Sequence, residues 1–367
     1  MKVSEITNRL EEWAPKSLQE AYDNSGFICG DPNQELTACL LSLDCTEAVV
    51  EEAIARGCNL IISHHPILFK GLKSLTGKSY VERTIIKAIE NRIALYAIHT
   101  NLDNVSTGVN SIIGKKMGLT QLKTLSPKAG NLKKLHTYVP RKHASSVRDA
   151  LFGAGAGKIS DYDRCSFNVE GIGTFRGGAG TNPFAGSPEK DHAEEEVKIE
   201  VIFESYLQPR LLSALTEAHP YEEVAFDIVS LDNRHPHIGS GMVGELSEPM
   251  REQDFLKMVS DRFECKVIRH TELLNKPVSR VAFCGGSGQF LLKQAIASGA
   301  DVFVTGDFKY HEFFDHEKKI VILDIGHFES EQFTPELIQQ FLLEKFPTFA
   351  VLLSEVNTNP VQYFISN

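Results

Sequence analysis

Hydrophobic residues are arranged along the chain as short apolar runs separated by segments with helical spacing. Four of these runs predict buried strands: residues 40–43, 60–63, 93–98 and 320–325. Between them, residues 46–56 and 81–91 carry apolar side chains at intervals of three and four, which predicts amphipathic helices. Strands that alternate with helices are typical of right-handed βαβ units and a largely parallel sheet. The pattern therefore predicts an α/β fold.

The same arrangement of helix and strand occurs twice in the chain. Residues 53–63 align without gaps on residues 295–305, and in both segments a helix that ends in glycine leads into a strand. The strand that runs into His99 corresponds in the same way to the strand that runs into His327. We infer a duplicated α/β unit with mainly parallel sheets, and chance similarity of two strand–helix pairs is the alternative.

The segment between the two copies has a different order of elements. Strands are expected at 135–139, 165–175, 197–203 and 222–229, and helices at 143–152 and 209–219. This β-α-β-β-α-β order is that of the ferredoxin-like split motif, so we expect an inserted α+β domain. The glycine- and charge-rich loop 177–196 is expected to be a mobile loop or an assembly surface.

Three domain segments follow from these patterns. Residues 1–126 form the first half of one α/β domain, residues 127–236 form the inserted domain, and residues 237–367 form the second half. At the start of the second half, Gly239 to Gly244 matches the spacing G-x-G-x-x-G. It does not join a strand to a helix, so it predicts a glycine-rich strand entry instead of a dinucleotide site.

Composition narrows the class of protein. The chain has 367 residues, enough for more than one domain, and its formal net charge of −10 argues against broad binding to a nucleic-acid backbone. Its seven cysteines are scattered without a C-x-x-C spacing, so neither a disulfide framework nor a thiolate zinc site is expected. Residues 1–15 read as an amphipathic helix, and no apolar run reaches membrane-spanning length. We expect a cytoplasmic protein with no membrane association.

Three of the expected strands end in residues that commonly bind metals. The first runs into His64 and His65, the second into His99 and Asp103, and the third into His327 and Glu331. Pro66 stops the first strand, so both adjacent imidazoles can lean over the carboxyl end of the sheet, where open α/β sheets bind ligands. Hydrogen-bonded loop histidines are the alternative for a single His-His pair.

His64, His65, Asp103, His327 and Glu331 together form a mixed nitrogen and oxygen ligand set. This set suits zinc, iron or manganese in a catalytic site, and the spacing of His327 and Glu331 places both on one face of a helix. Five ligands exceed what one catalytic ion takes while keeping an open position, so two ions per chain are expected. His99 is a candidate proton-transfer group or a supporting partner of the ligands.

Two interpretations apply to each of the other polar loop segments. Asp307, Lys309, Tyr310 and His311 follow the repeat partner of the His-His strand and are expected to face the same cleft, or to be ordinary loop residues. Lys70, Lys73 and Lys78 are expected to lie in a solvated loop, with an anion clamp as the alternative.

These motifs, together with Asp23-Asn24-Ser25-Gly26, resemble the NGG-interacting-factor-three-like family, whose members are often called GTP cyclohydrolase I type 2 homologs. The resemblance implies a dinuclear metal centre at the five ligands named above and a toroidal homohexamer with metal sites facing an internal cavity. The inserted segment, with His219-Pro220-Tyr221-Glu222-Glu223, resembles the PII-like or CutA-like module of long bacterial members.

Two functions are consistent with this resemblance. The first is a metal-dependent hydrolase in which a metal-bound hydroxide attacks an electrophilic carbon, with C8 of GTP as the target that the resemblance implies. Lys309, Lys70 and Lys73 are then the candidate partners of the triphosphate. The second is a non-catalytic metal-binding or regulatory assembly that senses a small molecule through the inserted domain. No residue pattern identifies a purine pocket.

Overall fold

The structure is a computed structural model that describes residues 1–364. It divides into two compact units. Unit 1 comprises residues 1–127 and the chain from residue 236 onward, and unit 2 comprises residues 128–235. Among the helices of residues 1–364, none combines the length and apolar character needed to cross a bilayer.

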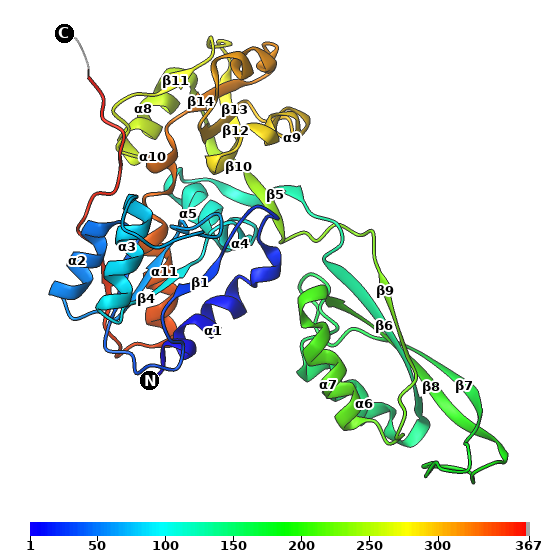
Figure 1. The fold of residues 1–367 in the computed structure, drawn as a ribbon. Helices are drawn as coiled ribbons and strands as arrows, with labels where there is room; N and C mark the ends of the chain where they lie inside the picture. The colour runs from blue at the N-terminus through cyan, green and yellow to red at the C-terminus, as the bar shows by residue number, and fades with distance from the viewer. Residues whose placement is uncertain (365–367) are drawn as a thin grey trace. The chain divides into compact units, whose positions relative to one another are not determined.

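Unit 1 contains two sheets (Figure 1). The first sheet has five strands in the order β1 (Gly26–Cys29), β4 (Ala94–Ala97), β3 (Leu60–Ser63), β2 (Cys39–Ser42) and β15 (Val351–Leu353). All pairings are parallel except that of β1 with β4. Every residue of β2, β3 and β4 is buried, as expected for strands covered on both faces.

Side chains at the helix starts fix the helices that cover this sheet. The helices of the first half are α1 (Val3–Trp13), α2 (Glu47–Ala55), α3 (Tyr80–Glu90), α4 (Thr100–Asp103) and α5 (Val109–Lys116). The hydroxyl of Thr46 accepts the Val49 N–H at the start of α2, and Ser79 caps α3 in the same way. Apolar residues of α2 and α3 then pack on one face of β2, β3 and β4.

The second sheet has six strands in the order β11 (Arg269–His270), β14 (Val321–Asp324), β13 (Val302–Gly306), β12 (Pro277–Ser287), β10 (Gly239–Arg251) and β5 (Thr120–Pro127). The helices of the second half are α8 (Glu252–Arg262), α9 (Leu292–Ala297), α10 (His327–Glu331) and α11 (Thr334–Lys345), of which α11 contacts β2 and β15 of the first sheet. Only the pairings of β13 with β12 and β14 are parallel, so the expectation of mainly parallel sheets is wrong here. Two of the three antiparallel pairings involve β10, which follows the insertion, and β5 leads the chain into it; the third is that of β11 with β14.

The same arrangement of four strands occurs in each of the two sheets. In the first, β2, β3 and β4 are parallel and β1 runs antiparallel beside β4. In the second, β12, β13 and β14 are parallel and β11 runs antiparallel beside β14. The strands that the sequence alignment matches, β3 and β13, are central in their sheets.

Unit 2 has one antiparallel four-stranded sheet in the order β7 (Phe167–Arg176), β8 (Asp191–Glu204), β6 (Leu132–Pro140) and β9 (Phe226–Ser230). Its helices are α6 (Ala144–Gly153) and α7 (Gln208–Ala218), which give the chain order β-α-β-β-α-β. Apolar residues of both helices pack on one face of the sheet. Strand β8 begins at Asp191, so the expected loop 177–196 is wrong at its end: it stops at residue 190 because β7 pairs with β8 along its full length.

Candidate functional site

Two adjacent histidines, His64 and His65, directly follow β3 in the first sheet. His64 is fully buried, and its Nδ1 lies 2.8 Å from the Ile98 carbonyl oxygen. A carbonyl only accepts, so Nδ1 carries the proton and the Nε2 of the neutral ring keeps a free lone pair. His65 places its Nδ1 2.8 Å from Oδ1 of Asp44, the residue that follows the strand next to β3.

The next strand, β4, leads into the short helix α4, which carries His99 before its first turn and Asp103 at its end. Nδ1 of His99 lies 2.7 Å from Oδ1 of Asp23. Asp23 also accepts the N–H of Thr100 at 3.0 Å and the Thr100 hydroxyl. These bonds hold the pKa of Asp23 below its usual range although burial opposes this. The orientation of His99 is therefore fixed by a buried carboxylate.

The second sheet supplies the remaining two residues. Gly326, with a φ of 98°, turns the chain from β14 into α10, where His327 and Glu331 lie one turn apart. Nδ1 of His327 lies 2.7 Å from Oδ2 of Asp307, which follows β13. Gly286 leaves room beside them, because a Cβ there would lie 2.6 Å from Oε1 of Glu331. Its φ of +58° also favours glycine.

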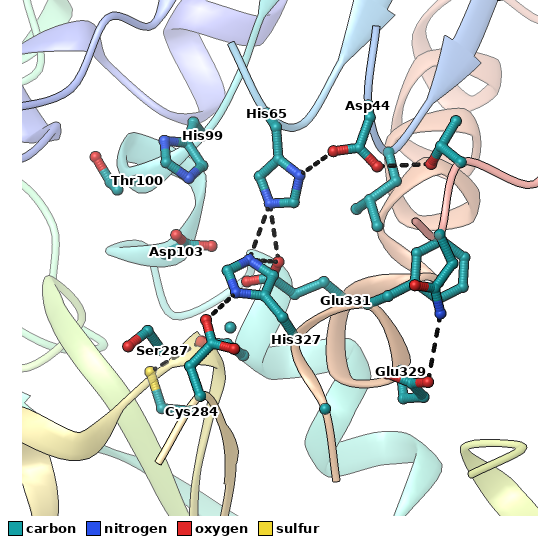
Figure 2. Close-up of a pocket in the computed structure, with 18 of the residues that line it drawn as sticks. Asp44, His65, His99, Thr100, Asp103, Cys284, Ser287, His327, Glu329 and Glu331 are labelled. Carbon is teal, nitrogen blue, oxygen red and sulfur yellow. Dashed lines mark hydrogen bonds and ion pairs between the residues drawn. The ribbon is translucent and has the colours of Figure 1, made fainter. Parts of the chain in front are cut away.

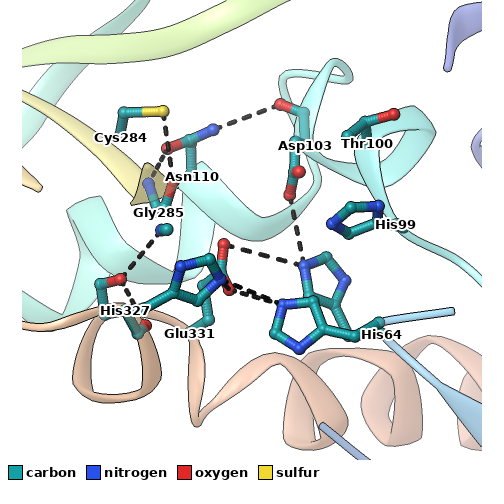
Figure 3. A network of polar contacts seen from close by, with 12 residues as sticks. His64, His99, Thr100, Asp103, Asn110, Cys284, Gly285, His327 and Glu331 are labelled. Atoms are coloured by element: carbon teal, nitrogen blue, oxygen red, sulfur yellow. Dashed lines mark hydrogen bonds and ion pairs between the residues drawn. The ribbon is translucent and has the colours of Figure 1, made fainter. Parts of the chain in front are cut away.

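The carboxylate of Glu331 joins two groups of side chains (Figures 2 and 3). Its Oε2 lies 3.0 Å from Nε2 of His65 and 3.1 Å from Nε2 of His327. Its Oε1 lies 3.8 Å from Nε2 of His64, which in turn lies 3.6 Å from Oδ1 of Asp103. The structure thus brings all five sequence-predicted ligands together, and the candidate ligand atoms of each group lie within 4.8 Å of one another.

His99 also belongs to this cluster. Its ring lies 5.2 Å from that of His64 and 5.4 Å from that of His65, measured between centroids. His64, His65 and His99 can direct one ring nitrogen each into a region 4.8 Å across. His99 is therefore near enough to be a ligand itself or to exchange a proton with a group bound there.

Close packing changes the protonation of the cluster. Burial and the charge of Glu331 raise the pKa of Asp103 to about 7. Burial opposes the charged form of His65, but hydrogen bonds with Asp44 and Glu331 outweigh it and raise the pKa of His65 to about 9. Burial alone would lower the pKa of His327, but the charges and hydrogen bonds of Glu331 and Asp307 outweigh it and raise this pKa to about 11. Burial would raise the pKa of Glu331, but these histidines hold it well below its usual range.

The cluster opens into a cavity of about 920 Å³. Aromatic side chains form much of its wall: Tyr22, Phe69, Tyr80, Phe290, Phe328 and Tyr363. Arg269 also lines the cavity and is paired with the buried Asp324. Part of the wall comes from residues 358–361 of the C-terminal segment, where the Thr358 hydroxyl donates to Oδ2 of Asp44 at 2.6 Å.

The chain matches known proteins over nearly its whole length. The family model of Duf34/NIF3 (NGG1p interacting factor 3) matches residues 1–360. The chain belongs to this family. It is 38% identical over 363 residues to the GTP cyclohydrolase 1 type 2 homolog of Halalkalibacterium halodurans, which covers 98% of both chains. It is 35% identical over 368 residues to the protein of that name from Staphylococcus aureus, covering 99% of this chain and 100% of the other.

Solved structures agree with this Duf34/NIF3 assignment. A Bacillus cereus protein related to NIF3 superposes with a TM-score of 0.86 at 36% identity, covering 99% of each chain. A Staphylococcus aureus protein superposes with a TM-score of 0.79 at 34% identity, again covering 99% of each chain.

The donor set of this Duf34/NIF3 chain fits a metal. Nε2 of His64 and Oδ1 of Asp103 are buried and have no hydrogen-bond partner among the described residues. Nε2 of His65 and Nε2 of His327 lie only 3.3 Å apart, so two ring protons at those atoms would face each other. A bound cation would satisfy the first pair and replace the protons of the second, and the Nδ1 bonds to Asp44 and Asp307 are the supports that metal-binding histidines usually have.

The structure adds site residues that the sequence argument missed. Asp44 was not singled out, although it directly follows the strand expected at 40–43 and the strand-end rule applies to it. No sequence pattern marks Thr358 as a site residue, because its position in the site depends on a contact with Asp44, which is 314 residues away in the sequence. Of the residues expected to follow the repeat strand into the cleft, Asp307 lines the cavity, whereas Tyr310 is 72% exposed.

Proposed function

We propose that this chain binds two divalent transition-metal ions and acts as a metal-dependent hydrolase. The observation that carries the proposal is the position of Glu331, whose two carboxylate oxygens face different ligand groups. His65 and His327 would hold one ion with Oε2, and His64 and Asp103 would hold the other with Oε1. Zinc suits this set of imidazole and carboxylate ligands best, and iron or manganese would also be accepted.

Two such ions, when bound, supply Lewis acidity and lower the pKa of a water molecule toward neutrality. The protein's own contribution is the placement of acid–base groups around the cavity. The Nδ1–H group of His99 donates a hydrogen bond to Asp23, so the Nε2 of the neutral ring can take up a proton from a reacting group and return it. The side chain of Asp23, which is fully buried, stabilises the charged imidazole that this transfer creates.

The cavity wall supports a planar substrate. Aromatic faces such as those of Phe69, Tyr80 and Phe290 suit a heterocyclic ring, and the volume is in the range usual for small-molecule sites. The relatives' name makes GTP the first substrate to test, with attack at C8 and release of formate. Lys70, Lys73 and Lys309 are absent from the lining residues of the described chain, so Arg269 and the metal ions are the cationic groups that remain for the phosphates.

The deciding experiment is metal analysis of protein purified without added metal, followed by a formate assay with GTP. Metal-loaded protein should release formate, and a chelator should abolish the release. His99→Ala should slow turnover more than tenfold, because a positioned acid–base group contributes about 10²-fold or more. Its metal content should stay near two ions per chain, and a loss of metal would make His99 a ligand instead.

The matched background is the Asp103→Ala variant. If metal-replete protein binds nucleotide but releases no more formate than this variant, the cyclohydrolase assignment is wrong. A screen of other nucleotides and phosphoesters would then decide whether the chain is a hydrolase of another substrate.

A second candidate function is a non-catalytic metal-binding or regulatory assembly. It is favoured by the charge of the cavity, where carboxylates outnumber the single arginine: Glu20, Asp44, Asp103, Asp307, Asp324, Glu329 and Glu331. Such a wall disfavours a triphosphate even after two divalent ions have bound. Full metal occupancy without turnover of any substrate in the screen would support this function.

We also propose a fold for unit 2 and an assembly for the chain. The β-α-β-β-α-β order and the strand order β7-β8-β6-β9 support a ferredoxin-like domain of the PII or CutA type. The family resemblance supports a toroidal homohexamer. Light scattering of the purified protein tests the hexamer, and a mass other than six chains would contradict it.

A further inference from the structure

Unit 2 contains a cavity of about 630 Å³ that the proposed hydrolase does not use. It lies on the face of the sheet opposite α6 and α7. Alternate residues of β8, such as Val197 and Ile199, are buried against those helices, so Glu196 and Lys198 face the other way, into the cavity. The volume lies within the usual range of small-molecule sites.

Glycines of β7, an edge strand of this sheet, form the floor of the cavity. Gly171 pairs directly with Glu196 of β8, and a Cβ added to Gly171 would meet no atom within 4 Å. At Gly173, by contrast, a Cβ would overlap the Glu196 carboxylate at 2.1 Å. Gly173 therefore makes room for the carboxylate, and Gly171 leaves empty space beside it.

Aromatic rings form one wall. The ring of Tyr221 lies 5.9 Å from that of Phe175 and 6.1 Å from that of Phe184, measured between centroids. His219 fixes the backbone at this point, because its Nε2 donates to the Tyr138 carbonyl at 3.0 Å while its Nδ1 accepts the Tyr221 N–H at 3.1 Å. Burial lowers the pKa of His219, which favours the neutral ring that this pattern requires.

The loop after β7 closes over these rings. Asn182 in this loop donates its N–H to the Glu222 carboxylate, at 3.1 and 3.3 Å from the two oxygens. The Glu189 N–H donates to the Gly177 carbonyl at 2.7 Å and ties the two ends of the loop together. Phe184 is thereby held against Tyr221, so the wall is preformed.

The only charged side chain buried in this cavity, among the described residues that line it, is Glu196. It is 8% exposed, and its Oε1 accepts the Tyr221 hydroxyl at 2.7 Å. Of the other lining charges, Glu170 pairs with Arg141 and Lys198 with Glu200, whereas Arg176, Glu222 and Glu223 are exposed. A buried carboxylate with one neutral donor on one oxygen still has acceptor capacity on the other.

We propose that this cavity binds a small organic cation, a primary amine or guanidine with an apolar body. The cationic group would pair with Glu196, and the apolar part would lie over Gly171 against the rings of Phe175, Phe184 and Tyr221. Aromatic faces attract cations, and a buried carboxylate gains most from a partner of opposite charge. Four carboxylates and two cationic side chains line the cavity, which disfavours anionic ligands.

Calorimetry on the full-length protein tests this site with three probes: 2-phenylethylamine, agmatine and the uncharged 2-phenylethanol. At least one of the two cations should bind in a saturable way, and 2-phenylethanol should bind at least about tenfold more weakly. Glu196→Gln should weaken the cation about tenfold or more, since it removes the charge and keeps the shape. Gly171→Val should abolish binding, because the added methyl groups fill the floor at a position with ordinary strand geometry.

The matched control is Glu195→Gln, which makes the same change at an exposed residue of the same strand that does not line the cavity. Its affinity for the cation should equal that of the unaltered protein. The proposal is overturned by a lack of binding of both cations, by equal affinity for 2-phenylethanol, or by equal losses in Glu196→Gln and Glu195→Gln. A changed oligomeric mass of Gly171→Val in light scattering would also overturn it, because the space would then receive a second copy of the chain.

Discussion

Replacing Asp44 by Asn should separate the affinities of the two metal ions. Asp44 touches the proposed centre only through His65, at 2.8 Å, and Thr358 holds its other oxygen at 2.6 Å. Asn preserves the shape, and its amide oxygen can still accept the hydrogen bond from the Nδ1–H group of His65. The substitution removes the negative charge that makes His65 a stronger base. Changes of this kind in the support of a metal-binding histidine typically cost about 10- to 100-fold in metal affinity.

That loss corresponds to about 1.4 to 2.7 kcal/mol and should fall on one ion only. His65 belongs to the group that shares Oε2 of Glu331, whereas His64 and Asp103 share Oε1. Zinc titrations against a chromophoric chelator at pH 7 should therefore show one weakened ion in Asp44→Asn and one unchanged ion.

Ser354→Ala is the matched control for this experiment. Ser354 lies in the same C-terminal segment as Thr358 and also donates to a carboxylate, but its partner is Glu52, which does not line the metal cavity. Its zinc affinities should equal those of the unaltered protein. Equal weakening of both ions in Asp44→Asn, or no weakening, would refute the division of the cluster into two groups.

Three further predictions concern the whole site and unit 2. Asp103→Ala should lower the metal content measured by mass spectrometry far more than His136→Ala in unit 2, and equal contents would contradict the site. The pKa of His65 in the folded protein, about 9, lies above its ordinary value of 6.5, so the stability that protonated His65 adds to the fold is complete below pH 6.5 and is lost as pH rises through about 9. The melting temperature of the metal-free protein should fall over this range. Zinc affinity should rise over the same range because the proton leaves the imidazole. Replacing residues 128–235 by a short glycine linker should leave unit 1 folded and metal-binding, because β5 and β10 pair up to Pro127; an insoluble product without metal would count against it.

The strand ends of the metal cluster could be predicted because each depends on local pattern. An apolar run followed by polar residues marks the carboxyl edge of a sheet, and this rule led to His64, Asp103 and Glu331. The spacing of His327 and Glu331 also predicted their common face, which α10 provides. The glycine-rich strand entry is confirmed, since β10 begins at Gly239.

The remaining features depend on contacts between distant segments. The antiparallel pairing of β5 with β10 is set by where the insertion leaves the sheet, and neither strand has a strong apolar run of its own. Lys70, Lys73 and Lys78 are exposed loop residues, as expected, and the alternative of an anion clamp is not supported, because position in a loop does not determine which way a long side chain points. Thr358 is positioned by tertiary packing alone, so no short-range pattern could identify it.

The division of the metal cluster between the two halves has a consequence for biosynthesis. His65 and Glu331 are separated by 266 residues, which a ribosome translates in roughly 13 to 53 s at about 5 to 20 residues per second. During that interval the nascent chain presents His65 and Asp44 without the Glu331 carboxylate, and the Thr358 hydroxyl that bonds to Asp44 is translated later still. We therefore expect tight metal capture at the proposed centre only in chains that have been translated past Glu331 and Thr358.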